Sequence, residues 1–141
     1  GDRKDVARRS RGKVKIRIKN GLPYISATLI HRRQRMTLKN ILLDTGSAGT
    51  IFSTDKVATI GLTYEPEDFV HRIRGVGGSE FVFTKRVDEL KVGGLKVSGF
   101  ELEIGAMNYG FDMDGIIGLD FLTAVGALID LDEMKLRAAI E

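Results

Sequence analysis

The sequence predicts an all-β fold, and three observations support this: the length of the chain, its glycine content and the alternation of polar and apolar residues. The 141 residues can bury one hydrophobic core but are too few for two domains of ordinary size. The chain is 43% hydrophobic and 29% charged, with 17 glycines and 2 prolines, which is typical of a globular, turn-rich protein. We therefore expect one compact domain built mainly from strands.

Strands in the first third of the chain are predicted from period-two patterns and turn residues. Lys and Arg alternate with Val and Ile over residues 13–19, as in a half-buried strand. Asn20 and Gly21 tolerate positive φ angles, so they suit the turn of a hairpin. A polar turn then separates the returning strand from a third strand. The expected strands are residues 13–19, 24–30 and 36–43.

The rest of the chain predicts further hairpins and little helix. Residues 54–60 suit a short helix that Ser53 or Thr54 caps and Gly61 ends. A buried strand that turns into a short helix is expected near the C-terminus, within residues 115–122. The expected strand pairs are residues 71–87 around a glycine tip, 90–104 around Gly93 and Gly94, and 127–140 around Asp132 and Glu133.

Composition excludes several classes of protein. The chain has no cysteine, which excludes disulfides, thiolate catalysis and thiolate zinc sites. No apolar stretch approaches the roughly 20 residues that cross a bilayer, so no membrane span is expected. The charged start does not resemble a signal peptide. The cellular compartment stays unknown, as does any anchor or targeting segment outside this sequence.

Positive charge is concentrated at the start of the chain. Residues 1–19 hold nine Lys or Arg against Asp2 and Asp5, whereas the whole chain has a net charge of +3, so the remainder is mildly acidic. A basic arm can bind nucleic acid, but a solvated tail is the favoured interpretation, and nucleic acid is not an expected partner. We predict a basic N-terminal arm or linker over residues 1–12 and a folded domain over 13–141.

Most catalytic classes lack the residues that they need. His31 lies in an arginine-rich turn and is expected to be solvated, and Ser47 lacks the spacing of a nucleophile elbow, so a serine hydrolase is disfavoured. The glycines of residues 75–79 have no phosphate-loop lysine and no dinucleotide fingerprint. Asp112 and Asp114 lack calcium-loop spacing and are expected to make turn and cap hydrogen bonds. We predict no metal and no cofactor.

Asp44 is the remaining candidate for catalysis. It follows the apolar residues Ile41-Leu42-Leu43 and opens a loop of small residues, Thr45-Gly46-Ser47-Ala48-Gly49. A carboxylate at the end of a buried strand costs several kcal/mol unless hydrogen bonds or a neighbouring charge compensate, and the loop's hydroxyls and amides suit that role. By itself, Asp-Thr-Gly-Ser is equally compatible with an ordinary turn.

A second motif makes the sequence resemble the retropepsins, the single-domain aspartic peptidases of retroviruses and their cellular relatives. Residues 42–47 match the active-site loop of that family. Gly115-Ile116-Ile117-Gly118 matches the hydrophobic pair and glycine that pack beneath the loop. The glycine hairpin lies between the two motifs, where the family places a mobile flap. The resemblance covers roughly residues 13–141 and implies a closed retropepsin-like barrel with a flap hairpin and one short helix near the C-terminus.

The resemblance also implies roles for individual residues. Asp44 would be the catalytic acid, and Thr45 would hydrogen-bond across a dimer to brace the paired loops. Gly46 would offer its backbone to the substrate, and Ser47 would donate a hydrogen bond toward the carboxylate, which favours acidic pH. Ile116, Ile117 and Gly118 would support the loop. The flap that closes over the peptide would comprise Gly75, Val76, Gly77 and Gly78.

The sequence contains a single Asp-Thr-Gly, whereas this chemistry needs two carboxyl groups that share a proton. Two-fold symmetry would supply the second acid, so we expect a homodimer. The resemblance further implies extended peptide substrates with bulky hydrophobic residues beside the cut, because the cleft of such enzymes is usually apolar. Ala48 and Leu119 depart from many viral members, which carry an acid and an arginine there. The alternative is a catalytically silent retropepsin-fold module that dimerises or binds peptides.

Overall fold

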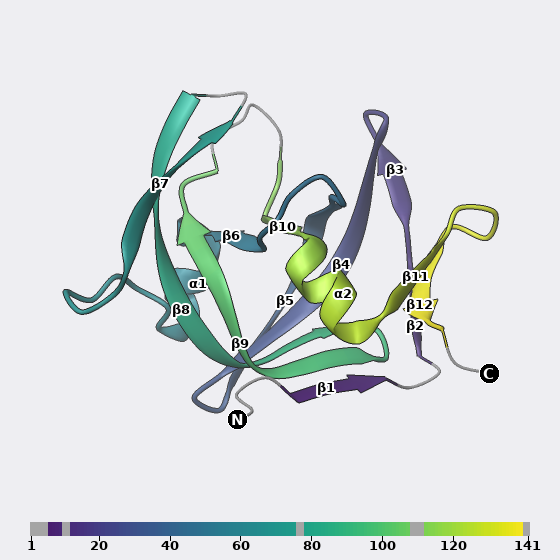
Figure 1. Cartoon of the computed structure of the whole chain (residues 1–141), viewed down its shortest axis with the longest axis horizontal. Helices are drawn as coiled ribbons and strands as arrows, with labels where there is room; N and C mark the ends of the chain where they lie inside the picture. Colours follow the sequence, from purple (N-terminus) through teal and green to yellow (C-terminus); the bar gives the residue numbers. More distant parts are fainter. Residues whose placement is uncertain (1–5, 10–11, 76–77, 108–111, 140–141) are drawn as a thin grey trace.

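Strands make up most of the chain that the structure describes. The computed structural model describes residues 6–9, 12–75, 78–107 and 112–139 (Figure 1). The strands are β1 (Val6–Arg9), β2 (Lys13–Lys15), β3 (Arg17–Lys19), β4 (Leu22–His31), β5 (Gln34–Leu43), β6 (Ile51–Ser53), β7 (Val70–Gly75), β8 (Gly78–Val92), β9 (Leu95–Gly105), β10 (Gly115–Ile117), β11 (Ala127–Asp130) and β12 (Lys135–Ala138). The helical elements are α1 (Thr54–Val57), the 3-10 helix η1 (Ala58–Ile60) and α2 (Leu119–Val125).

Nine of the described strands form one sheet. Its order is β1-β9-β6-β10-β5-β4-β8-β7, and β3 pairs with β4. The long strand β8 pairs with β4 near its C-terminal end and with β9 over most of its length. At the centre, the short strand β10 runs parallel to β5 and antiparallel to β6. A second sheet has the order β11-β12-β2. The mainly-β class predicted from the sequence is confirmed.

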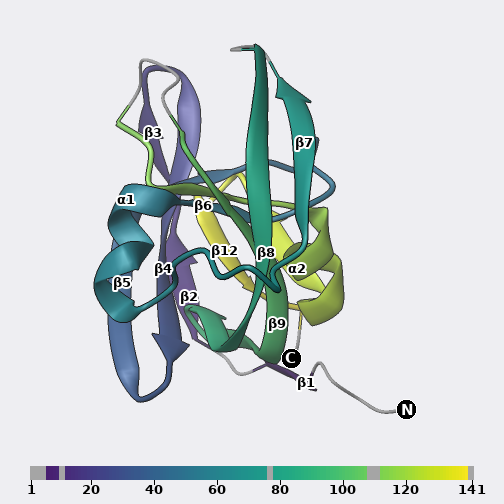
Figure 2. The ribbon, with the colours of Figure 1, turned by 90° about the vertical axis from the view of Figure 1, so that its left-hand side faces the viewer.

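Two hairpins project from the same side of the molecule. Figure 1 shows the β7–β8 hairpin and the β3–β4 hairpin rising with β6 and β10 between them, and Figure 2, turned by 90°, shows the same two projections. The β3–β4 turn uses positive φ angles of 54° at Asn20 and 77° at Gly21, as the sequence predicts. These hairpins flank the strand ends at which the Asp44 loop begins.

The hydrophobic core consists of two clusters. The larger cluster fills the space between the sheet, α1 and α2, and Phe52, Val57 and Phe121 in it are fully buried. The smaller cluster comprises Tyr24, Ile51, Val82, Met107 and Met113, against which Leu22, Leu42, Ile73 and Ile116 pack. Because Ile73 comes from β7 and Ile116 from β10, the smaller cluster joins the β7–β8 hairpin to the strands beside Asp44.

The short helices agree with their predictions in position. Residues 54–60 form α1 and η1, and Gly61 ends them in a left-handed conformation with φ of 84°. Ser53 occupies the N-cap position of α1, but its side chain makes no capping hydrogen bond, contrary to the expectation of a side-chain cap. The strand-to-helix turn expected within residues 115–122 is β10 followed by α2, which ends at Gly126 with φ of 59°.

The first twenty residues differ from the prediction in two respects. The alternating segment 13–19 is not one strand: β2 pairs with β12 in the small sheet, whereas β3 pairs with β4 in the large one. The break is at Ile16, which is 2% exposed and whose backbone N–H donates to the Met134 carbonyl at 2.8 Å. Within the segment predicted as a basic arm, residues 6–9 form β1, paired with the edge of β9.

His31 also differs from expectation, because it is buried rather than solvated. His31 is 8% exposed, and its Nδ1 lies 3.9 Å from Asp88 Oδ1 but makes no hydrogen bond with any part of the chain that the structure describes. Loss of hydration lowers the pKa of His31 more than the neighbouring Asp88 raises it. His31 precedes the β4–β5 turn, in which Arg32 and Arg33 both have positive φ angles.

Candidate active site

Asp44 begins the loop that follows β5, at the point where three strands meet. β10 is in parallel register with β5, so Ile116 lies beside Leu42 and Ile117 beside Leu43. The Asp44 backbone N–H donates to the Ile117 carbonyl at 3.0 Å, which continues the ladder by one residue. The predicted supporting pair, Ile116 and Ile117, therefore fixes the backbone of the candidate acid.

The loop after Asp44 is held by short-range hydrogen bonds. The Gly46 backbone N–H donates to Asp44 Oδ1 at 2.9 Å, and the Ser47 N–H donates to the Asp44 carbonyl at 3.1 Å. The Ser47 hydroxyl donates to the Gly49 carbonyl at 2.8 Å, so the predicted hydrogen bond from this hydroxyl to the carboxylate is not formed. Asp44 is half-buried and Thr45 is exposed. An amide, rather than a hydroxyl, therefore orients the carboxylate.

Gly118 lets the loop lie directly on the turn between β10 and α2. A Cβ atom at Gly118 would lie 2.3 Å from the Gly49 carbonyl oxygen and 2.7 Å from that of Ser47. The next residue, Leu119, donates its backbone N–H to the Ser47 carbonyl at 2.8 Å. Any side chain at position 118 would push the loop away, which is a physical reason for glycine in this motif.

Thr50 and Asp120 brace the far end of the loop, and sequence reasoning did not single out either one. Thr50 is fully buried; its hydroxyl donates to Asp120 Oδ1 at 2.7 Å and accepts from the Gly118 N–H at 3.1 Å. The Thr50 N–H donates to Asp120 Oδ2 at 3.2 Å. The sequence did contain a signal for this contact: each of the two apolar motifs is followed by a polar residue, Thr50 or Asp120. A buried polar group needs a hydrogen-bonding partner, so the two could have been paired.

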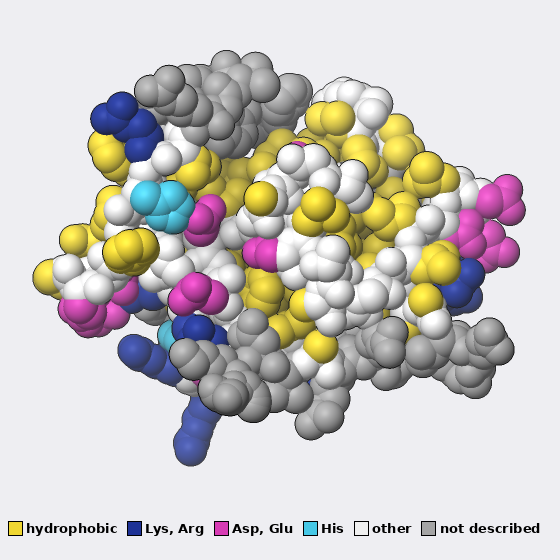
Figure 3. Space-filling model, viewed as in Figure 1, with side chains coloured by type: hydrophobic (Ala, Val, Ile, Leu, Met, Phe, Trp, Pro, Cys, Tyr) yellow, Lys and Arg dark blue, Asp and Glu magenta, His cyan; other side chains and the backbone are white. Residues whose placement is uncertain are grey.

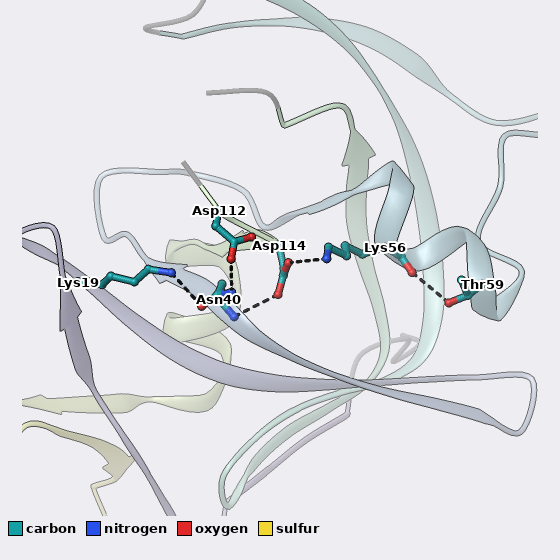
Figure 4. Close-up of polar contacts among 6 residues, drawn as sticks. All are labelled: Lys19, Asn40, Lys56, Thr59, Asp112 and Asp114. Atoms are coloured by element: carbon teal, nitrogen blue, oxygen red, sulfur yellow. Dashed lines mark hydrogen bonds and ion pairs between the residues drawn. The ribbon is translucent and has the colours of Figure 1, made fainter. Parts of the chain in front are cut away.

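A second polar network supports the other side of the site (Figure 4). Asn40 in β5 donates its N–H to Asp114 Oδ2 and its amide Nδ2 to Asp112 Oδ2, both at 3.2 Å. Asp114 is 6% exposed; its Oδ1 receives no hydrogen bond from the described residues but lies 3.5 Å from Lys56 Nζ of α1. Lys19 donates to Asn40 Oδ1 at 3.1 Å. Both aspartates therefore accept hydrogen bonds from a distant strand, whereas turn and cap hydrogen bonds were expected. The described residues contain no group of three or more His, Asp or Glu that could hold a metal ion.

The predicted flap corresponds to the β7–β8 hairpin. Gly75 pairs with Gly78 at its described end, and Val76 and Gly77 lie outside the described residues. Along β7, His71 and Ile73 are partly buried whereas Val70 and Arg72 are exposed. The first two therefore face the body of the protein. The space-filling view shows hydrophobic side chains in the centre of the face between the two projecting hairpins (Figure 3).

A cavity of about 320 Å³ adjoins the loop on the hairpin side. Gly49 and Thr50 of the loop line it together with residues of β7, β8 and β9, and with Asp120. Asp44 is not one of the residues that line this cavity. The cavity is therefore a neighbour of the candidate acid rather than its immediate surroundings.

Comparison with known proteins agrees with the motifs. The family model described as aspartyl protease matches residues 34–121, which include the Asp44 loop, the hairpin and the β10–α2 turn. This is more than half of the chain, and the chain belongs to this retropepsin-like aspartyl protease family. No curated protein matches the chain. None of the helices in the described residues has the length and hydrophobicity that a membrane span requires.

Proposed function

We propose that the protein is an aspartic endopeptidase that acts as a homodimer, with the two Asp44 carboxyl groups meeting on the dimer axis. The observation that carries the proposal is the placement of Asp44, a half-buried acid at the end of β5. Its backbone N–H hydrogen-bonds the Ile117 carbonyl, and its carboxylate accepts a hydrogen bond from the Gly46 amide. Membership of the aspartyl protease family supports peptide hydrolysis as the reaction class.

The chemistry requires the two carboxyl groups in different protonation states. The ionised group takes a proton from a water molecule, whose oxygen attacks the scissile carbonyl carbon. The protonated group hydrogen-bonds the carbonyl oxygen and transfers its proton as the tetrahedral intermediate forms. The proton taken from water then passes to the leaving nitrogen. As the C–N bond breaks, one hydroxyl of the intermediate returns its proton to the carboxylate that protonated the carbonyl oxygen, which restores the starting pair. Two carboxyl groups about 3 Å apart share one proton, which supplies both states at once.

Dimerisation is proposed because each chain has a single Asp-Thr-Gly. Thr45 and Ala48 are exposed, and Leu119 is 42% exposed although it is apolar and directly follows Gly118. A second copy placed against this loop would cover these side chains and let the Thr45 hydroxyls bond across the axis. In the same proposal, residues 13–141 form the peptidase domain, and the pairing of β8 with both β4 and β9 supports a closed barrel.

Substrate selection is proposed to rest on the smaller apolar cluster and the hairpin. Leu42, Ile73 and Ile116 are partly buried and border the strands around Asp44, so they suit bulky hydrophobic side chains of an extended peptide. The hairpin would act as a flap, formed by Gly75, Val76, Gly77 and Gly78, and would exclude water from the bound peptide. Gly46 would hydrogen-bond the peptide backbone.

The test is cleavage of a mixed peptide library across acidic and neutral pH by the wild type and by Asp44→Asn. The variant keeps the shape of the side chain but cannot ionise, so we expect cleavage to fall about a thousandfold while the fold is retained. Asp132→Asn, which removes one charge from an exposed turn, is the matched control and should keep full activity. A pepstatin-like inhibitor should block the wild type.

Two outcomes would contradict the proposal. Equal cleavage by the wild type and Asp44→Asn would show that another group, or a contaminant, cuts the peptides. Peptide binding without cleavage at any pH, unchanged in Asp44→Asn, would instead indicate a silent binding module of the same fold.

A further inference from the structure

The β7–β8 hairpin is joined to the body of the protein by a His–Glu side-chain contact that crosses one strand. His71 Nε2 in β7 lies 2.6 Å from Glu103 Oε2 in β9, and β8 runs between these strands. In the ladders, His71 is opposite Val82, and Thr84 is opposite Glu103. Since paired residues and alternate residues share a face, all four side chains lie on one side of the sheet. The pair therefore crosses β8 diagonally, from the position opposite Val82 to the position opposite Thr84.

The pair lies where the hairpin leaves the sheet. β8 pairs with β9 from Val82 onward, whereas the described residues before Val82 pair with β7. A two-stranded ribbon in water has little stability of its own, and its twist varies more than that of a wider sheet. Besides the packing of Ile73 on the smaller apolar cluster, the His71–Glu103 contact joins β7 to the body at this junction.

Glu103 is at the same time attached to the candidate catalytic loop. Its backbone N–H donates to the Thr50 carbonyl at 3.0 Å, and Oε1 would lie 3.5 Å from a Cβ atom built on Gly49. One residue therefore contacts both the hairpin, through its carboxylate, and the end of the loop that starts at Asp44, through its backbone.

The other acidic side chains near the contact have partners of their own, whereas the Glu103 carboxylate contacts His71. The cavity beside the loop is also lined by Glu101 and Asp120, but these acids have other partners. Glu101 lies 3.7 Å from Arg86, and Asp120 accepts hydrogen bonds from Thr50 and from the Phe121 N–H. Figure 3 shows acidic and histidine side chains gathered below the hairpin. Among the cavity-lining residues, His71 is the side chain that contacts the Glu103 carboxylate.

We propose that the contact between His71 and Glu103 is a positioning contact that sets the β7–β8 hairpin over the Asp44 loop for substrate binding. Its substrate effect rests on the proposed peptidase function, whereas its effect on the hairpin does not. Both residues are positioning residues, because neither one touches the carboxylate at which the reaction occurs.

The experiment is a double-mutant cycle with His71→Ala, Glu103→Ala and the double variant. A contact between partly exposed groups predicts a rise in KM of about threefold in each single variant, with kcat unchanged within about twofold. The double variant should show no larger rise than either single one, because both remove the same contact. Glu101→Ala, which removes a carboxylate from the same cavity and strand, is the matched control and should leave KM unchanged.

Amide hydrogen exchange of residues 70–75 and 78–83 provides a readout that needs no activity. Both single variants should speed exchange in this hairpin, and Glu101→Ala should not. Additive effects in the double variant, or unchanged exchange and KM in both single variants, would overturn the positioning role while leaving the proposed function intact. If the wild type cleaves no peptide, the proposed function fails, and the exchange rates alone then decide the role of the pair.

Discussion

Thr50 shows how one buried hydroxyl can determine the shape of the candidate active-site loop. It donates to Asp120 Oδ1 and accepts from the Gly118 N–H, so it joins the end of the loop to the start of α2. If a buried hydroxyl is removed, the donors and acceptors that it paired with stay buried without a hydrogen bond. The loop geometry around Asp44 therefore depends on side chains outside the Asp-Thr-Gly motif itself.

We predict that Thr50→Val destabilises the protein by about 1–3 kcal/mol, because the isosteric side chain leaves the Gly118 amide without its acceptor and removes one of the hydrogen bonds that Asp120 accepts. Urea unfolding of the wild type and variant measures the difference. Thr37→Val is the matched control: this hydroxyl contacts Thr28 Oγ1 at 3.0 Å on an exposed surface, so its loss should cost less than about 0.5 kcal/mol. Equal losses in the two variants would refute the bracing role of Thr50.

At the same scale, sequence reasoning identified Asp44 but not its hydrogen-bonding partners. The apolar residues before Asp44 and the Gly115–Gly118 motif are local patterns, and both lie where they were expected. The donor to the carboxylate is the Gly46 amide, whereas a Ser47 hydroxyl bond was expected. Which of two nearby donors is aimed at an acid depends on backbone dihedral angles, and residue types alone do not specify them.

Among the elements, the loop between η1 and β7 depends on a three-membered charge cluster. Lys85 Nζ in β8 lies 2.5 Å from Glu65 Oε1 and 2.9 Å from Asp68 Oδ2, and the side chains of Lys85 and Asp68 are 11% and 10% exposed. Burial opposes both charges, but the mutual hydrogen bonds prevail: they raise the pKa of Lys85 and lower the pKa of Asp68. The cluster fixes the approach of the chain to the first strand of the hairpin.

We predict that Lys85→Met destabilises the protein by about 2–4 kcal/mol near neutral pH, because it leaves Asp68 buried without its cation. Since the pKa of Asp68 is below its ordinary value of 3.8, its contribution is present above that pH and is lost as the pH falls through the lowered value. The difference between wild type and variant should therefore shrink in strong acid. Denaturant unfolding at several pH values measures it.

The control for this cluster is Lys135→Met, which breaks an exposed pair with Glu133 at 3.7 Å. Exposed pairs contribute little, so the loss should be below about 1 kcal/mol and should not change with pH in the same way. A Lys85→Met variant as stable as the wild type at neutral pH would show that the loop is held by other contacts.

Local periodicity predicted the elements better than it predicted their partners. The hairpins around residues 20–21 and 93–94 have their turns as expected, because each has its own alternation and turn residues. Segment 13–19 also alternates throughout, yet Ile16 divides it between two sheets. β1 lies in a charge-rich segment without such a signal, and its pairing with β9 is a long-range contact that the sequence pattern cannot reveal.

For the whole molecule, the family follows from two motifs that lie far apart in the sequence and adjacent in space, whereas the mainly-β class follows from the alternation and turn residues along the chain. Asp44 and Gly118 are separated by 73 intervening residues, but β5 and β10 run side by side. The homodimer remains a prediction, because the single Asp-Thr-Gly is a chemical requirement for a partner rather than a contact within one chain. Its test must therefore involve two chains in one assembly.

Mixing wild-type chains with Asp44→Asn chains tests that requirement directly. If the active species is a homodimer that exchanges subunits, an equal mixture leaves about one quarter of all dimers with two intact acids. Activity per wild-type chain should then fall to about half, and a larger excess of the variant should suppress it further. Activity per chain of the wild type alone should also decrease on dilution, because dimers dissociate.

Mixing with Asp132→Asn, which keeps both acids, should cause no loss. An activity that stays proportional to wild-type concentration in every mixture would mean that one chain suffices, and the shared-site mechanism would be wrong.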